Sequence, residues 1–254
     1  MNVQTELWNA FNDIKFDEES HTYTDSKGTN YTSATKWKNR FLPKIDWVAI
    51  AKKSAEKTGE DYREVQKRWK QAGDYASTLG TEVHLFMENL WLKKNYKFNN
   101  SLDKKFPEMR SDFEFRKERC IKIFNSLKKC VVPIATELVI NDSEFGICGT
   151  VDFLGYNQNT KEFYIFDWKT SKKFETESFF SKELLEPFTH LRNVNTVEYS
   201  LQLSLYKYII EKHTNIKISK LTLFQIPNKD SCFSSVHECL DLSNDIKRYL
   251  ENNS

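Results

Sequence analysis

Glycine, proline and cysteine are all scarce in this chain, and long apolar runs are missing. Seven glycines and five prolines in 254 residues exclude collagen-like and low-complexity chains. The five cysteines include no C-x-x-C pair, which disfavours a disulfide scaffold and indicates a reduced, cytoplasmic protein. No stretch approaches the ~18 apolar residues of a membrane span, and residues 1–20 lack an apolar leader core. We therefore expect a soluble intracellular protein without a membrane partner.

Charged and aromatic residues are plentiful instead. Charged residues make up 29% of the chain and aromatic residues 14%, a mixture typical of an ordered globular protein. The formal net charge is only +2, so the whole molecule is not a polycation. We expect a single domain over residues 1–254, mainly helical in 1–130 and built on a sheet in 131–254.

Helical patterns dominate the first half of the chain. Residues 21–37 alternate around a turn and predict a short hairpin that leads into a helix. Helical spacing then runs over residues 46–94, with Asp46 as N-cap and Gly59 as a break between two helices. A further helical run covers residues 107–129.

Strand patterns begin after residue 130. Three β-branched and aromatic runs with short connections predict an antiparallel meander, and a helix at 197–213 can return the chain to the same sheet. The fold class is therefore α/β, with a central mixed sheet flanked by helices and an N-terminal helical layer. The predicted strands are 135–140, 147–156, 162–168, 218–226 and 235–242, and a closing helix covers 243–252.

Two aspartates and a lysine interrupt the apolar strands of the meander. Asp152 lies inside an apolar run, and Asp167 ends another. Carboxylates in apolar segments are costly unless they are paired or bound to a metal, which favours a functional role over ordinary strand-end carboxylates. Lys169 follows Asp167 by two residues and projects to the same face of a strand. Phosphodiester hydrolysis uses hard oxygen ligands to hold Mg²⁺ or Mn²⁺, and an ammonium can stabilise the charge on phosphate.

A histidine and two glutamates are candidates to join this site. His84 and Glu88 are four residues apart and share one face of a helix, where they either join a metal site or make an ordinary structural contact. Glu137 lies on the strand before Asp152. It is either a further ligand or a partner that holds Lys169.

Polar residues near the end of the meander are candidates for contacting the substrate. Gln202 and Tyr206 are four residues apart on the predicted helix 197–213. They form either a polar stripe that touches phosphate or base, or a satisfied amide beside an aromatic core residue. Directly after the strand, and placed to contact phosphate, come Thr170, Ser171 and Lys172.

Four motifs together resemble those of RecB-like nucleases of the PD-(D/E)xK superfamily. In chain order they are Gly80-Thr81-x-x-His84-x-x-x-Glu88, Gly149-Thr150-Val151-Asp152, Asp167-Trp168-Lys169-Thr170-Ser171 and Gln202-x-x-x-Tyr206. A further segment is similar to phage relatives and to the mitochondrial genome maintenance exonuclease group, namely His21-x-Tyr23 followed by Thr32-Ser33-Ala34-Thr35. The similarity covers roughly residues 20–210, and the shared order and spacing of the motifs make it specific.

The resemblance implies a restriction-endonuclease-like core and gives these residues roles. It implies a site for one or two Mg²⁺ or Mn²⁺ ions, with Lys169 catalytic, formed by His84, Asp152, Asp167 and the backbone carbonyl of Trp168. Glu88 and Glu137 would be supporting acids, and Gln202 and Tyr206 would position the substrate strand. Some RecB-like members carry an iron–sulfur cluster on one upstream and three tail cysteines. The tail here offers only Cys232 and Cys239, so we expect no cluster.

Residues 36–70 are a candidate DNA-contacting layer. They hold eleven Lys/Arg against five Asp/Glu, interleaved with Trp37, Trp47, Tyr62 and Trp69. Basic residues beside aromatic rings suit backbone contact and base stacking on single-stranded DNA. Alternatively, the tryptophans pack between helices and the lysines form a solvated face.

The sequence thus predicts a metal-dependent deoxyribonuclease, and an exonuclease that acts on DNA ends, favouring single strands, is the first hypothesis. A structure-specific or flap endonuclease would use the same site and stays open. A non-catalytic DNA-binding subunit is disfavoured because Asp152, Asp167 and Lys169 are all present. No RNA-binding module is visible. A role in DNA repair, recombination or phage replication, with a single-strand-binding or recombination protein as partner, is compatible with these motifs but not readable from them.

Overall fold

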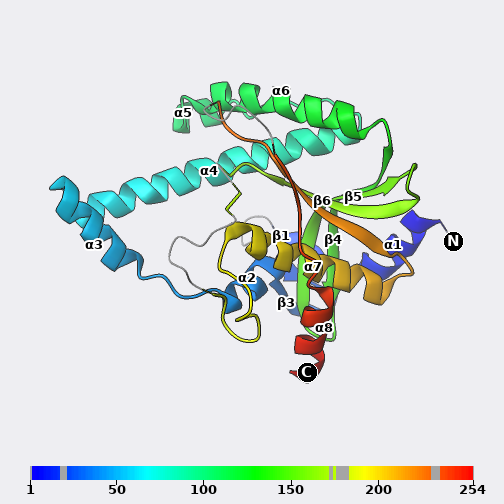
Figure 1. The fold of residues 1–254 in the computed structure, drawn as a ribbon. Helices are drawn as coiled ribbons and strands as arrows, with labels where there is room; N and C mark the ends of the chain where they lie inside the picture. The colour runs from blue at the N-terminus through cyan, green and yellow to red at the C-terminus, as the bar shows by residue number, and fades with distance from the viewer. Residues whose placement is uncertain (1, 18–21, 172–173, 176–182, 230–234, 254) are drawn as a thin grey trace.

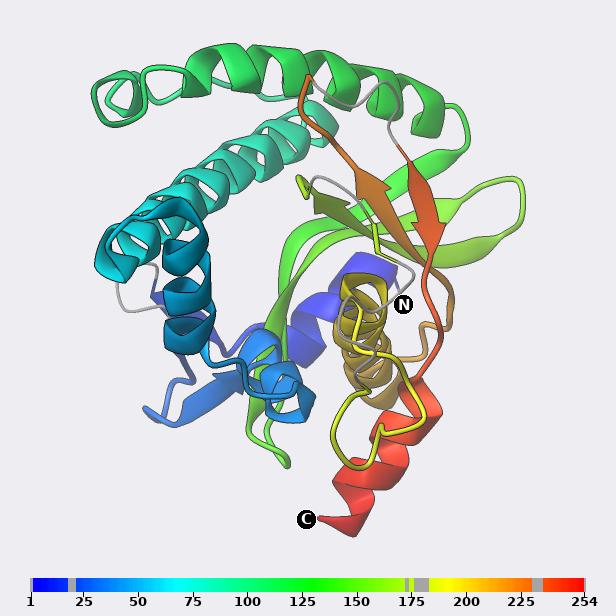
Figure 2. The same ribbon diagram turned by 60° about the vertical axis from the view of Figure 1, so that its left-hand side comes forward.

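The computed structural model describes residues 2–17, 22–171, 174–175, 183–229 and 235–253. Helices lie on both sides of a twisted sheet, with the two termini well apart (Figures 1 and 2). Three residues used in the sequence predictions lie outside the described residues, namely His21, Lys172 and Cys232.

The described strands form one mixed, eight-stranded sheet in the order β1-β2-β3-β5-β6-β7-β8, with β4 along the other edge of β5. β3 with β5 and β6 with β7 pair in parallel, and the other pairings are antiparallel. The predicted meander is confirmed as β4-β5-β6, and the chain returns to the same sheet as β7. The strands are β1 (Lys15–Asp17), β2 (Thr22–Thr24), β3 (Asn30–Ser33), β4 (Val131–Asp142), β5 (Ile147–Asn157), β6 (Glu162–Lys169), β7 (Ile218–Gln225) and β8 (Val236–Glu238).

The helices cover the two faces of the sheet in two groups (Figure 1). None of the helices described is both long enough and apolar enough to cross a membrane. The α-helices are α1 (Val3–Phe11), α2 (Ala34–Lys38), α3 (Trp47–Thr58), α4 (Tyr62–Trp91), α5 (Leu102–Lys105), α6 (Met109–Leu127), α7 (Asn195–His213) and α8 (Ser243–Asn252), and a 3-10 turn, η1 (Asn39–Phe41), follows α2.

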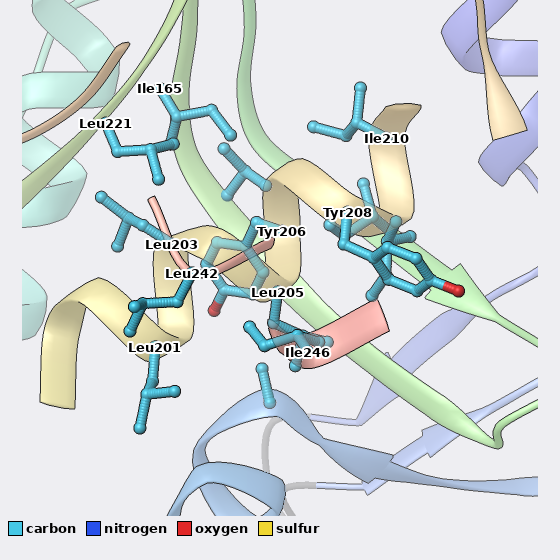
Figure 3. Close-up of a cluster of buried hydrophobic side chains, with 14 of the residues drawn as sticks. Ile165, Leu201, Leu203, Leu205, Tyr206, Tyr208, Ile210, Leu221, Leu242 and Ile246 are labelled. Atoms are coloured by element: carbon cyan, nitrogen blue, oxygen red, sulfur yellow. The ribbon is translucent and has the colours of Figure 1, made fainter. Parts of the chain in front are cut away.

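The two faces of the sheet belong to different hydrophobic cores. On β6, Tyr164, Phe166 and Trp168 pack in the core that α4 and α6 share with the sheet. Ile165 belongs instead to the core around α7, where it lies with Leu221 of β7 among the apolar side chains of α7 and α8 (Figure 3). This alternation is the period of two of a β-strand, so the odd-numbered residues of β6 face α7.

Helix α3 and the first half of α4 project from the sheet and have a small core of their own (Figures 1 and 2). The side chain of Asp46 caps α3 by accepting the backbone N–H of Ala49 at 2.9 Å. Gly59 ends α3 in the left-handed conformation, with φ of 71°. The predicted N-cap and the predicted break are therefore confirmed. The buried contacts between the two helices come from Ala51, Ala55 and Val65.

Two features differ from the sequence predictions. The predicted strand 235–242 is reduced to β8, because two backbone N–H groups beyond it hydrogen bond to serine hydroxyls of α7 and not to a neighbouring strand. The Oγ of Ser200 accepts the N–H of Leu240 at 3.1 Å, and the Oγ of Ser204 accepts the N–H of Leu242 at 2.9 Å. The sequence pattern also does not predict α1, which buries only two side chains.

A buried carboxylate joins the end of β4 to the end of α7. The Oδ2 atom of Asp142 lies 2.7 Å from the Nζ of Lys212 and accepts a hydrogen bond from the Nε2 of His213 at 3.0 Å. Its Oδ1 accepts the N–H of Phe145 at 3.2 Å. Burial opposes ionisation, but the hydrogen bonds from His213, Lys212 and the Phe145 N–H lower the pKa of Asp142 to about 2. The ionised carboxylate therefore stabilises the folded state.

We predict that Asp142→Asn lowers the free energy of unfolding at pH 7 by about 2 kcal/mol. The folded-state pKa is below the unfolded one, so this stabilisation is present above about pH 4 and disappears as the pH falls toward about 2. Urea unfolding at pH 7, 5 and 3 measures both effects. Glu144→Gln, at the exposed acid that also pairs with Lys212, is the matched control and should change little. Equal losses at pH 7 and pH 3 would contradict an electrostatic origin.

Candidate active site

Three acidic residues occupy equivalent positions on three adjacent strands. The residues on either side of Glu137 in β4 pair with those on either side of Asp152 in β5, so the two acids lie opposite each other. One step beyond the last β5–β6 pair, Asp152 lies opposite Asp167. Because neighbouring strands are about 5 Å apart, three carboxylates on one line form a strong local concentration of negative charge.

The backbone of Glu137 is held in a conformation that is rare for its residue type. Its φ is 46°, in the left-handed region, although the residue lies within a strand and is not glycine. Such a conformation costs about 1–3 kcal/mol and persists only where the surrounding structure enforces it. Here it accompanies a carboxylate directed at the side chains of Asp152 and His84.

The acids lie where β5 changes its partner. On one edge, β5 pairs with β3 at Ile147 and Cys148, and with β6 only from Phe153 onward. No described strand pairs with residues 149–152 on that edge. At this point a side chain and not the backbone of β5 bonds to β6, since the Oδ2 of Asp152 accepts a hydrogen bond from the backbone N–H of Trp168 at 3.0 Å.

Helix α4 brings His84 to the acids. The Nε2 of His84 lies 2.7 Å from the carbonyl oxygen of Trp168, and a carbonyl only accepts, so Nε2 carries a proton. The Nδ1 atom lies 3.3 Å from the Oδ2 of Asp152 and 4.0 Å from the Oε1 of Glu137. The Nδ1 atom therefore faces the two carboxylates.

The donor set fits a divalent cation. Ligand atoms of His84, Glu137 and Asp152 all lie within 4.8 Å of one another. Burial and the carboxylates of Asp152 and Glu88 raise the pKa of Glu137 to about 8. Imidazole nitrogen and carboxylate oxygens suit Mn²⁺, and carboxylate oxygens suit Mg²⁺. The cluster includes Glu137, to which the resemblance gives only a supporting role. It does not include Asp167, which pairs with Lys169 instead.

Asp167 is paired with Lys169, as their spacing on one strand predicts. The Nζ of Lys169 lies 2.6 Å from the Oδ2 of Asp167, and both side chains are largely buried. Burial raises the pKa of Asp167 even though the ammonium opposes the rise. Burial lowers the pKa of Lys169, but the carboxylates of Asp167 and Asp152 outweigh it and raise the value, so the lysine is cationic.

Gln202 and Tyr206 lie beside the acids but are not equally accessible. The ring of Tyr206 is buried, and its hydroxyl accepts a hydrogen bond from the Nε2 of Gln202 at 2.8 Å. A Cβ on Gly149 would lie 2.5 Å from the Cε1 of Tyr206, so only glycine lets β5 approach this ring. The half-buried amide of Gln202 is thus the group of this pair that a substrate can reach.

The other predicted site residues are more scattered. Glu88 is close enough to raise the pKa of Glu137 but is not in the ligand cluster. The carbonyls of Thr170 and Ser171 accept hydrogen bonds from Arg116 of α6 and Gln225 of β7, at 3.3 and 2.9 Å. These bonds fix the chain directly after Lys169.

Several residues at the site were not predicted from the sequence. Tyr23 of β2 shares a hydrogen bond with the Thr150 hydroxyl at 3.1 Å, and the Arg116 guanidinium is buried at the ends of β6 and β7. Lys38 of α2 and Tyr199 of α7 lie close to Lys169. Tyr199 precedes Gln202 by three residues on one helix, a spacing that could have identified it. Tyr23 belongs to the His21-x-Tyr23 segment of the sequence resemblance, which gave it no role. No local pattern identifies Lys38 or Arg116, because only the tertiary fold brings them here.

A family comparison agrees with this geometry. The family model described as PD-(D/E)XK nuclease superfamily matches residues 57–252, which include α4, the whole meander and α7. No curated protein matches the chain in sequence.

We predict that Glu137→Gln weakens Mn²⁺ binding about tenfold or more, because even residues that only support metal ligands change affinity about 10- to 100-fold. Isothermal titration calorimetry of the folded variants gives the affinity. Glu144→Gln, an exposed acid on the turn after β4, is the control and should bind as the wild type does. Unchanged binding in Glu137→Gln, with a loss in Asp167→Asn, would instead favour the ligand set that the resemblance implies.

Proposed function

The chain belongs to the PD-(D/E)XK nuclease superfamily, whose members are metal-dependent nucleases, and we propose that it is a RecB-like deoxyribonuclease that digests single-stranded DNA from its ends. The proposed nuclease activity rests on one observation, that a possible metal-binding cluster lies next to a buried ion pair. A cluster of His84, Glu137 and Asp152 lies next to a buried pair of Lys169 and Asp167.

The cluster would hold Mg²⁺ or Mn²⁺. A bound divalent ion supplies an activated water molecule and stabilises negative charge on the phosphate. His84 and Asp152 are already oriented for this role, since each is hydrogen bonded to the peptide backbone of Trp168. Lys169 offers a fixed positive charge beside the same carboxylates, where a phosphate approaching them gains a second partner.

The projecting pair of helices supports the preference for single strands. Trp47, at the start of α3, is 59% exposed, and its ring meets the ring of Trp69 edge-on at 6.2 Å. Trp37, by contrast, is a buried core residue. Exposed Lys52 and Lys53 lie on the same helix as Trp47. An exposed aromatic ring and unburied lysines on one projecting helix suit stacking of an unpaired base and contact with phosphate.

We predict that Lys169→Met lowers the rate of cleavage about 100-fold or more, because a buried charge that acts in the transition state is removed. The assay uses 5′-end-labelled single- and double-stranded DNA with Mn²⁺, Mg²⁺ or EDTA, and circular dichroism confirms folding. The product ladder separates digestion from ends from internal cutting. Lys207→Met is the matched control, because Lys207 is also largely buried and ion-paired, at 2.7 Å from Asp241, but lies about two turns beyond Tyr199 on α7. DNA binding without metal-dependent cleavage by the wild type would favour a non-catalytic subunit.

We further predict that the triple reversal of Lys52, Lys53 and Lys67 to Glu weakens binding of single-stranded DNA. Three lost phosphate contacts should reduce the slope of log K against log salt by about 2. Fluorescence anisotropy at several salt concentrations measures it. The matched triple control reverses Lys217, Lys220 and Lys247, which are exposed lysines at the start of β7 and on α8. Equal losses in both triples would show only a response to net charge.

A further inference from the structure

The aromatic ring of Tyr199 contacts the ammonium groups of two lysines from different parts of the fold. The Nζ of Lys169, at the end of β6, lies 4.8 Å from the centre of the ring, and the Nζ of Lys38, on α2, lies 5.7 Å from it. Both distances are within the range of a cation–π interaction. Tyr199 itself lies on the first turns of α7 and is partly buried.

Each of the two lysines also has a carboxylate partner. Lys169 pairs with Asp167, and Lys38 pairs with Glu198, the neighbour of Tyr199, at 3.6 Å. Lys38 is 6% exposed, which is rare for a lysine and costly without such partners. The ring and the adjacent carboxylate of α7 therefore hold two like charges close together in a buried place.

The two contacts of Lys169 restrain the position of its ammonium group in different ways. The ion pair with Asp167 fixes the distance of the ammonium from one carboxylate oxygen. A flexible four-carbon stem can still swing about that contact. The ring of Tyr199 lies against the same ammonium and restricts this motion, because a cation favours the face of an aromatic ring.

We propose that Tyr199 is a positioning residue that holds the ammonium of Lys169 against the active-site carboxylates, with Lys38 and Glu198 fixing α2 against the same segment of α7. The proposal rests on the nuclease function proposed above. It assigns the effect to the aromatic face and not to the hydroxyl, so phenylalanine should replace tyrosine and leucine should not.

The test compares Tyr199→Phe with Tyr199→Leu in single-turnover digestion of labelled single-stranded DNA with Mn²⁺. We expect Tyr199→Leu to lower the rate of cleavage about tenfold, consistent with a partly buried cation–π contact. The DNA concentration for half-maximal rate and the Mn²⁺ affinity by calorimetry should change less than about twofold, since the ammonium stays in the site and only its alignment in the transition state is lost. Tyr199→Phe should keep at least about half of the wild-type rate.

A double-mutant cycle gives a readout that a merely structural role would not produce. In the Lys169→Met background, measured with excess enzyme, Tyr199→Leu should cause no further loss, because the residue through which it acts is gone. Lys207→Met, at the buried ion-paired lysine farther along α7, gives the cost of perturbing the helix and should leave the rate unchanged.

Three results would overturn the proposal while leaving the nuclease function intact, and a fourth would overturn both. Full activity of Tyr199→Leu shows that the ring is dispensable, and an equal loss in Tyr199→Phe assigns the effect to the hydroxyl. Additive losses in the double mutant show that Tyr199 does not act through Lys169. A wild type that binds Mn²⁺ but cleaves no DNA removes the proposed function itself, and with it the reaction that this contact would serve.

Discussion

Crowding of negative charge at one point of the sheet is the constraint on which the rest of the structure depends. Glu137, Asp152 and Asp167 lie on one line across three adjacent strands, close to the hydrophobic core. Ionised carboxylates in such a place cost several kcal/mol each unless cations or hydrogen-bond donors compensate them. The raised pKa values of Glu137 and Asp167 express that cost directly. An arrangement so unfavourable for the protein alone is what a site for a divalent cation requires.

Each acid is compensated in a different way, and the differences suggest a division of labour. Asp167 is matched by an internal cation, Lys169, while Asp152 accepts a backbone N–H. Glu137 has the weakest compensation, with His84 4.0 Å away and a strained backbone at φ of 46°. Glu137 is therefore the acid that would gain most from a bound metal ion, which is the reason for testing it as a ligand beside His84 and Asp152.

The parts of this site that could be predicted are those encoded by local spacing. Asp167 and Lys169 are two residues apart on a strand and meet as expected, and the meander that places Asp152 beside Asp167 is confirmed. The role of Glu137 stayed open because it depends on a strand register and a left-handed residue, which no local pattern specifies. Lys38 and Arg116 were not predicted either. They arrive from α2 and α6, and a lysine or arginine on a helix ordinarily remains in solvent.

One residue, Trp168, connects the helices α4 and α6 with the active-site end of the sheet. The N–H of Trp168 binds Asp152, its carbonyl binds His84 of α4, and its indole is buried in the core between α4, α6 and the sheet. A shift of α4 would therefore move His84, loosen Trp168 and release Asp152 together. The buried guanidinium of Arg116 on α6 extends this coupling to the two residues after Trp168, through the carbonyl of Thr170. Helices α4 and α6 thus fix the geometry of the acids through these contacts with Trp168 and Thr170. Helix α3 and the start of α4 project beyond the sheet and pack on each other. The same long helix, α4, belongs to both parts, because its first half packs on α3 and its second half carries His84.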